Sequence, residues 1–128
     1  MPTPFTDRIT GIHAATIVPM RRDFSVDEDA LARHIVDVTR IEGLRGLLLN
    51  GHAGENFVLT GAEKRRVVEI AREVAPDTLI VSGVNQESSL EAAREARELE
   101  EAGADGLLVF PPNSWALGHV EYCGFLHH

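Results

Sequence analysis

Cysteine, lysine and bulky aromatic residues are scarce in this 128-residue chain, which has one cysteine, Cys123, and one lysine, Lys64. A single cysteine excludes an intramolecular disulfide and a metal cluster built from several cysteines. No segment approaches the ~20 consecutive apolar residues of a membrane-spanning helix. Residues 1–10 contain no apolar core of a secretory signal, and we therefore expect a cytoplasmic protein with no membrane partner.

Positive charge is also in short supply, with 12 Lys and Arg against 20 Asp and Glu and a formal net charge of −8. Nucleic-acid binding normally requires clustered Lys and Arg, so we expect no nucleic-acid partner. The hydrophobic share of 44% and the charged share of 25% are typical of soluble globular domains. The length suits one domain or a piece of a larger one.

Four short apolar runs, bounded by glycine or proline, recur along the chain at residues 11–18, 46–50, 78–82 and 106–110. Continuous apolar runs of this length are typical of strands that are buried on both faces of a parallel sheet. A sheet with one face in water would alternate apolar and polar residues instead.

Three helices are predicted between these strands, and each opens with the Ser/Thr-x-x-Glu pattern of a capping box. The three pairs are Ser25 with Glu28, Thr60 with Glu63, and Ser88 with Glu91. The helices are expected to end before Gly43, Pro76 and Gly103. Their inward stripes are predicted to be Leu31, His34, Ile35, Val38 and Ile41; then Val67, Val68, Ile70, Ala71 and Val74; and last Leu90, Ala93, Ala96 and Leu99.

The β-α-β-α-β-α-β order implies right-handed crossovers and a parallel sheet. Two architectures fit this order, a small doubly wound sheet and the first half of a (β/α)8 barrel, and periodicity does not choose between them. Residues 119–128 show no helical stripe and no cap, and we interpret them as a tail.

Ligands of either architecture bind at the carboxyl ends of the strands, which here are residues 18–20, 50–55, 83–85 and 110–113. The glycines at 51 and 54 let the backbone turn tightly, so that the N–H groups between them could cradle a carboxylate or phosphate, although a plain βα turn has the same pattern. His52 could act as a general acid or base, or could simply bond the nearby backbone.

Trp115 could line a pocket or pack on a neighbouring subunit. No pair of histidines has the spacing of metal ligands on a helix, so no metal site is expected.

One segment resembles a known signature. The sequence Gly-His-Ala-Gly-Glu at residues 51–55, followed by Phe57, Leu59-Thr60 and Glu63-Lys64-Arg65, is similar to the Gly-Thr-Thr-Gly-Glu…Leu-Thr…Glu-Arg signature of the dihydrodipicolinate synthase/N-acetylneuraminate lyase family. Residues 15–20, 101–106 and 109–112 resemble further segments of that family, in the same order.

The resemblance implies the α/β fold of a parallel (β/α)8 barrel, here its first four strands and three helices, over residues 1–118, with residues 119–128 outside the family pattern. It implies a lyase of the class I aldolase type, which joins an active-site lysine to pyruvate or another 2-oxo acid as a Schiff base and uses no other cofactor. The backbone N–H groups of His52 and Ala53 would bind the carboxylate of the 2-oxo acid, and the His52 side chain could carry a proton.

The chain departs from the family at several positions. His52 and Ala53 replace two threonines, Val18 replaces a third, and Pro112-Asn113 replaces a pair of tyrosines. The family's catalytic tyrosine on the fifth strand and its lysine on the sixth have no counterpart here, and Lys64 falls in the second helix.

We therefore expect a truncated member that is inactive alone, with no catalytic residue of its own beyond the proton-carrying role open to His52. The alternatives are a non-catalytic half barrel that self-associates or binds a carboxylate, and a protein whose missing half comes from another chain. Two open sheet edges favour a homo-oligomer.

Overall fold

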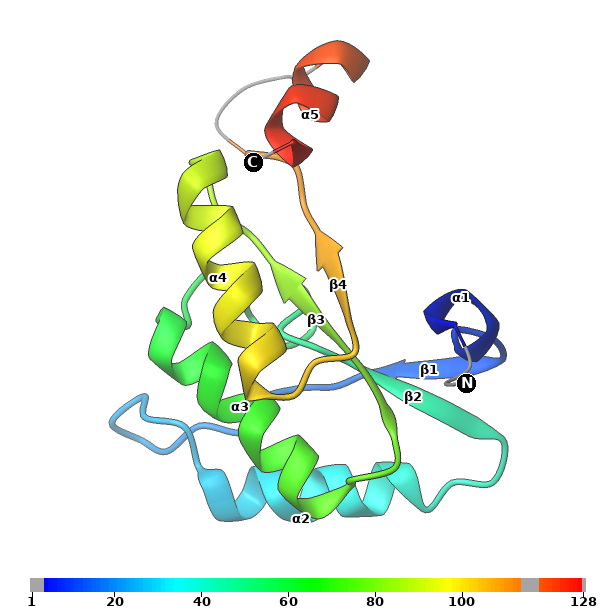
Figure 1. Cartoon of the computed structure of the whole chain (residues 1–128). Helices are drawn as coiled ribbons and strands as arrows, with labels where there is room; N and C mark the ends of the chain where they lie inside the picture. The colour runs from blue at the N-terminus through cyan, green and yellow to red at the C-terminus, as the bar shows by residue number, and fades with distance from the viewer. Residues whose placement is uncertain (1–3, 114–117, 128) are drawn as a thin grey trace.

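The computed structural model describes residues 4–113 and 118–127, which fold as four parallel strands with helices between them (Figure 1). Their order along the chain is α1 (Phe5–Arg8), β1 (Ile12–Ala15), α2 (Glu28–Thr39), β2 (Leu44–Leu49), α3 (Gly61–Val74), β3 (Leu79–Val84), α4 (Ser89–Ala102), β4 (Gly106–Val109) and α5 (His119–Leu126). The four predicted strands and the three predicted helices between them are confirmed.

The sheet decides between the two architectures that the sequence left open. Its strands follow the chain in the order β1-β2-β3-β4, and each neighbouring pair is parallel. The helices α2, α3 and α4 lie side by side along one face of the sheet (Figure 1). A doubly wound sheet carries helices on both faces, so this is the α/β half barrel.

The helix starts follow the capping chemistry only in part. At α3 the capping box is complete, because the Thr60 side chain accepts from the Glu63 N–H and the Glu63 carboxylate accepts from the Thr60 N–H. At α4 only the first half of the box forms, from Ser88. The box predicted at Ser25 is wrong. Asp27 caps α2 instead.

The physical reason lies just before α2. The Ser25 hydroxyl and N–H both donate to the Asp23 carboxylate, at 2.7 and 3.1 Å, and this local turn occupies the serine. The Asp27 carboxylate then accepts from the Ala30 N–H at 3.0 Å and supplies the cap two residues later than predicted.

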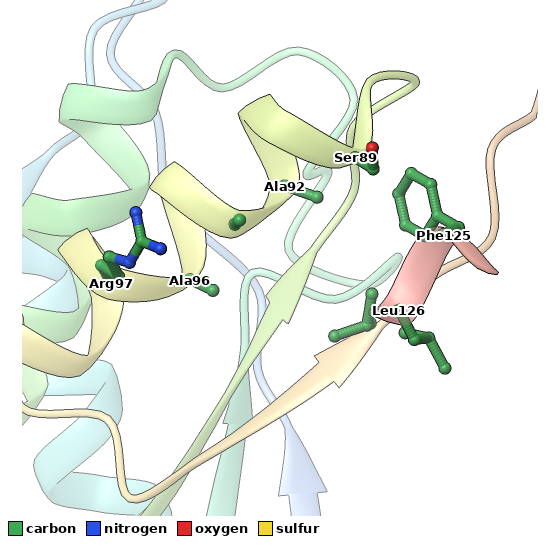
Figure 2. Close-up of a pocket in the computed structure, with 8 residues that line it drawn as sticks. Ser89, Ala92, Ala96, Arg97, Phe125 and Leu126 are labelled. Carbon is green, nitrogen blue, oxygen red and sulfur yellow. The ribbon is translucent and has the colours of Figure 1, made fainter. Parts of the chain in front are cut away.

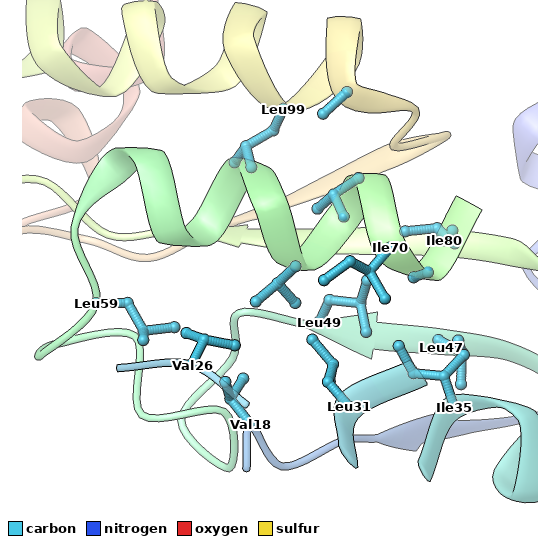
Figure 3. Packing of buried hydrophobic residues seen from close by; sticks show 14 of the residues in the cluster. Val18, Val26, Leu31, Ile35, Leu47, Leu49, Leu59, Ile70, Ile80 and Leu99 are labelled. Atoms are coloured by element: carbon cyan, nitrogen blue, oxygen red, sulfur yellow. The ribbon is translucent and has the colours of Figure 1, made fainter. Parts of the chain in front are cut away.

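The core lies between the sheet and the three long helices (Figure 3). Its fully buried members include Leu47 and Leu49 of β2 and Ile80 of β3, which all point towards the helices. The remaining buried residues of the cluster are Val18, Val26, Leu31, Ile35, Leu59, Val67, Val68, Ile70, Ala71, Ala75, Val84, Ala92, Leu99 and Ala102.

Two residues predicted on inward stripes are exposed instead. Ile41 follows the end of α2 and is 59% exposed, while Leu90 in the first turn of α4 is 69% exposed. The buried face of α4 runs through Ala92, Glu95 and Leu99. It is shifted from the predicted stripe because the sequence of this helix is rich in alanine, which fits either face.

Short helices at both ends add to the three predicted ones. In α1, Arg8 pairs with Asp105 at 3.4 Å, which ties the beginning of the chain to the amino end of β4. The residues interpreted as a tail form α5, whose Phe125 and Leu126 line a cavity of about 250 Å³ beside α4 (Figure 2). The boundary at residue 118 stays a prediction.

Within the described part of the chain, no helix has the length and apolar character needed to cross a membrane.

Candidate functional site

The turn that follows β2 has a strained and well-bonded backbone. Asn50 and Glu55 both have positive φ, at 51° and 54°, which non-glycine residues adopt only when the surroundings hold them there. Between them the N–H of Gly54 donates to the carbonyl of Gly51, and the N–H of Glu55 donates to the carbonyl of His52. The glycine turn that the sequence predicts is therefore present, and its shape is fixed from both sides.

The Asn50 side chain anchors this turn in the core. It is completely buried, and its Nδ2 donates to the carbonyl oxygen of Lys64 at 3.0 Å and to the Ser82 hydroxyl at 2.9 Å. Strand β3 also passes very close, since a Cβ placed on Gly83 would lie 2.1 Å from the Asn50 carbonyl oxygen. The end of β2 is thus fixed to both α3 and β3.

The His52 ring contacts two phenylalanines. Its centroid is 4.5 Å from that of Phe110, nearly parallel at 16°, and 4.9 Å from that of Phe57, tilted by 35°. Phe110 directly follows β4, so the contact brings the ends of β2 and β4 together. The structure gives the His52 ring no hydrogen-bond partner among the described residues, in contrast to the reading of a histidine bonded to nearby backbone.

The backbone N–H groups of His52 and Ala53 are neighbours in the exposed part of the turn. Both residues are exposed, and within the described residues neither N–H donates a hydrogen bond. The next residues, Gly54 and Glu55, do use their N–H groups within the turn. Two free, neighbouring donors at the carboxyl end of a strand form the kind of cradle that carboxylates and phosphates occupy.

The ends of β3 and β4 are also joined. The Asn113 side chain donates to the Asn85 carbonyl oxygen Oδ1 at 3.3 Å, and the Asn113 N–H donates to the Glu87 carboxylate at 2.7 Å. The ends of β2, β3 and β4, three of the four strand ends at which the sequence places ligands, are therefore connected by these contacts. Trp115, a candidate for a pocket wall, lies outside the described residues.

Residues 8–127 match the sequence profile described as the Dihydrodipicolinate synthetase family. The chain belongs to this family. A 4-hydroxy-tetrahydrodipicolinate synthase from Acidiphilium cryptum (strain JF-5) is 39% identical over 103 residues, which cover 80% of this chain and 35% of that protein. An N-acetylneuraminate lyase from Actinobacillus pleuropneumoniae serotype 5b (strain L20) is 35% identical over 120 residues, covering 88% and 39%.

A solved family structure confirms the barrel relationship. The dihydrodipicolinate synthase from Agrobacterium tumefaciens str. C58 superposes with a TM-score of 0.86 at 28% identity, over 93% of this chain and 40% of that chain. The chain therefore spans only 35–40% of the length of these relatives, which are named as synthases and a lyase.

The sequence places Lys64, the only lysine, in the correct helix but gives neither its burial nor its partner. It lies in the first turns of α3, as predicted, yet it is only 2% exposed and its Nζ lies 2.8 Å from Oε1 of Glu95. Glu95 is itself 4% exposed and was not singled out from the sequence. This amine is therefore the buried partner of a carboxylate.

Asp105 lies away from the turn. At the amino end of β4, burial opposes ionisation of Asp105, but the hydrogen bond from the Ile80 N–H and the Arg72 guanidinium outweigh it and hold the pKa of Asp105 below its ordinary value. Among the described residues, no three His, Cys, Asp or Glu side chains are grouped so that they could hold a metal ion.

Proposed function

We propose that this chain supplies the carboxylate-binding side of a class I aldolase site that acts on pyruvate or another 2-oxo acid. The observation that carries the proposal is the pair of free N–H donors of His52 and Ala53, at the exposed turn after β2. Backbone donors bind a carboxylate whatever side chains they carry, so the histidine and alanine in place of two threonines do not remove this role.

The proposed chemistry is Schiff-base formation, with the imine acting as an electron sink for bond making or breaking at the neighbouring carbon. Lys64 is not the nucleophile of this proposal, because its ammonium is buried against Glu95. The imine lysine therefore comes from outside these 128 residues, and we expect these residues alone to be inactive. Their cytoplasmic location stays a prediction from the sequence.

His52 is the proposed proton carrier of the site. Its imidazole is exposed, and the contacts with Phe57 and Phe110 hold the ring without occupying its nitrogens. An imidazole with free nitrogens can both accept and donate a proton. Ala53 can supply only its N–H.

A titration followed by amide NMR tests carboxylate binding. Pyruvate is expected to shift the amide signals of His52 and Ala53 first, while pyruvamide, which has no carboxylate, is expected to leave them in place. Replacing His52 by Ala keeps the N–H, so binding should change little. Equal shifts with both compounds, or shifts spread over unrelated amides, would contradict the proposed cradle.

A second experiment tests the nucleophile. Sodium borohydride reduces an imine between a lysine and pyruvate to a stable covalent adduct. We expect no such mass increase when this chain is treated with both compounds. A covalent adduct at Lys64 would contradict the proposal that Lys64 is not the nucleophile.

Self-association without catalysis is the second candidate function, and the edge strands favour it. Strands β1 and β4 are the outer strands of the sheet. Ile12 of β1 is 70% exposed, and Leu107 and Leu108 of β4 are 38% and 40% exposed. Apolar edge strands of this kind pair readily with other chains. Sedimentation velocity over a range of concentrations tests the idea, and a monomer at all concentrations would exclude it.

A further inference from the structure

We propose that the buried Lys64–Glu95 ion pair is a positioning device, which sets the geometry of the carboxylate-binding turn relative to the ends of β3 and β4. The inference rests on the proposed function, since the turn is the one formed by His52 and Ala53. Neither charged group touches the turn's free N–H donors. Both act through neighbours that do form the site.

The pair joins two helices below the strand ends. Lys64 lies on α3 and Glu95 on α4, and their side chains are 3% and 5% exposed. Glu95 also accepts from the Gln86 amide at 3.2 Å and from the Asn85 N–H at 3.3 Å. A buried carboxylate with three donors is well satisfied, and such a satisfied buried network is rigid.

One branch of this network reaches the turn. The carbonyl oxygen of Lys64 accepts from the buried Asn50 amide, and Asn50 is the residue of positive φ that begins the turn. Fixing Lys64 by its side chain therefore fixes the acceptor that holds Asn50. Any movement of this part of α3 would be transmitted to the N–H groups of residues 52 and 53.

The other branch reaches the neighbouring strand ends. Glu95 holds the backbone of Asn85, and the Asn85 side chain accepts from Asn113, which follows β4. The two branches meet at one ion pair, so a single interaction connects the ends of β2, β3 and β4. Aromatic contacts of His52 with Phe110 join the same ends on the exposed side.

A charge pair is an unusual choice for a position between two helices. Taking both charges out of water costs free energy that their attraction barely returns, so well-packed apolar residues would stabilise the helix contact at least as well. Apolar side chains, however, would leave Asn85 and Gln86 without their shared acceptor. The pair is therefore better explained by the arrangement it enforces than by the stability it adds.

The test uses the double variant Lys64→Met with Glu95→Leu, which replaces the pair by apolar side chains of similar volume. We expect it to fold with a melting temperature close to that of the unsubstituted chain. We also expect its affinity for pyruvate to fall roughly tenfold, as for a site whose supporting groups have moved. Its ligand-free amide signals at residues 52, 53 and 113 should shift as well.

The matched control is the pair formed by Arg65 and Glu69, which lie one helical turn apart on α3 at 3.0 Å and are partly exposed. Arg65→Met with Glu69→Leu should change neither the affinity nor those amide signals. A double variant at 64 and 95 that folds, binds pyruvate normally and leaves the three amides in place would overturn the proposal.

Two further results are separated by design. If the double variant does not fold, Glu95→Gln is used in its place, because it keeps the shape of the side chain and an acceptor but removes the charge. We again expect the affinity for pyruvate to fall and the ligand-free amide signals to shift. If the unsubstituted chain does not bind pyruvate, the proposed function fails. The ligand-free amide signals still decide whether the pair positions the turn.

Discussion

Substituting Gly83 by Ala tests how closely β3 is packed against the turn after β2. A Cβ at this position would lie 2.1 Å from the carbonyl oxygen and 2.9 Å from the carbonyl carbon of Asn50. Ordinary contacts begin above 3 Å, so one of the two backbones has to move by about 1 Å. Neither can move easily, because the Asn50 amide is bonded to Lys64 and to Ser82.

The expected cost follows from this geometry. Inserting a methyl group into a filled core typically costs 1–3 kcal/mol, and more where backbone blocks it. We therefore expect Gly83→Ala to lower the free energy of unfolding by about 3 kcal/mol. Because the turn itself is displaced, the amide signals of His52 and Ala53 should shift, and pyruvate affinity should fall.

Urea unfolding followed by circular dichroism measures the change, and Gly61→Ala is the matched control. Gly61 begins α3, and a Cβ there would meet nothing within 4 Å. Alanine favours the helix by up to about 1 kcal/mol, so this variant should be as stable as the unsubstituted chain or slightly more so. If Gly83→Ala shows the same midpoint as Gly61→Ala, the close packing of β3 on the turn is refuted.

Three further predictions concern the frame that carries the turn. Thr60→Ala removes the capping box of α3 and should cost about 1 kcal/mol in urea unfolding; an unchanged midpoint would contradict the cap. Leu99→Ala should lower the free energy of unfolding by about 2–5 kcal/mol, while Leu90→Ala should change it by no more than about 0.5 kcal/mol. Equal losses would contradict the assignment of Leu99 to the buried face of α4 and Leu90 to the exposed one. Asp105 has a lowered pKa, so its stabilising contribution is present above its unfolded pKa and is lost as pH falls through the lower, folded value. Thermal unfolding between acidic and neutral pH should therefore depend less on pH in Asp105→Asn, and an unchanged dependence would count against the pairing with Arg72.

Much of the fold is predictable because strands and helices of a parallel sheet have strong local patterns. The apolar run at residues 46–50 needs no tertiary information to be recognised as buried strand. The face of α4 is different. Ala92, Ala93 and Ala96 have little side chain to indicate a side, and Leu90 stands in the first turn of the helix and is exposed.

The candidate site likewise has one part that the sequence predicts and another that it does not. Glycines at 51 and 54 predict a tight turn with available N–H groups, because the turn is a local structure. The surroundings of His52 are not local. Phe110 lies 58 positions further along the chain and reaches the histidine only because β2, β3 and β4 end at the same edge of the sheet.

The ion pair between Lys64 and Glu95 could also be predicted from the sequence. Lys64 precedes Val67 and Val68 by three and four residues and thus shares their buried stripe, although Glu63 and Arg65 beside it suggest a solvated face. Glu95 lies three residues after Ala92 and four before Leu99, again on a buried stripe. A charge at an inward position requires a partner of opposite sign, and consecutive crossover helices on one face of a parallel sheet are neighbours. Two opposite charges at inward positions of α3 and α4 therefore predict each other.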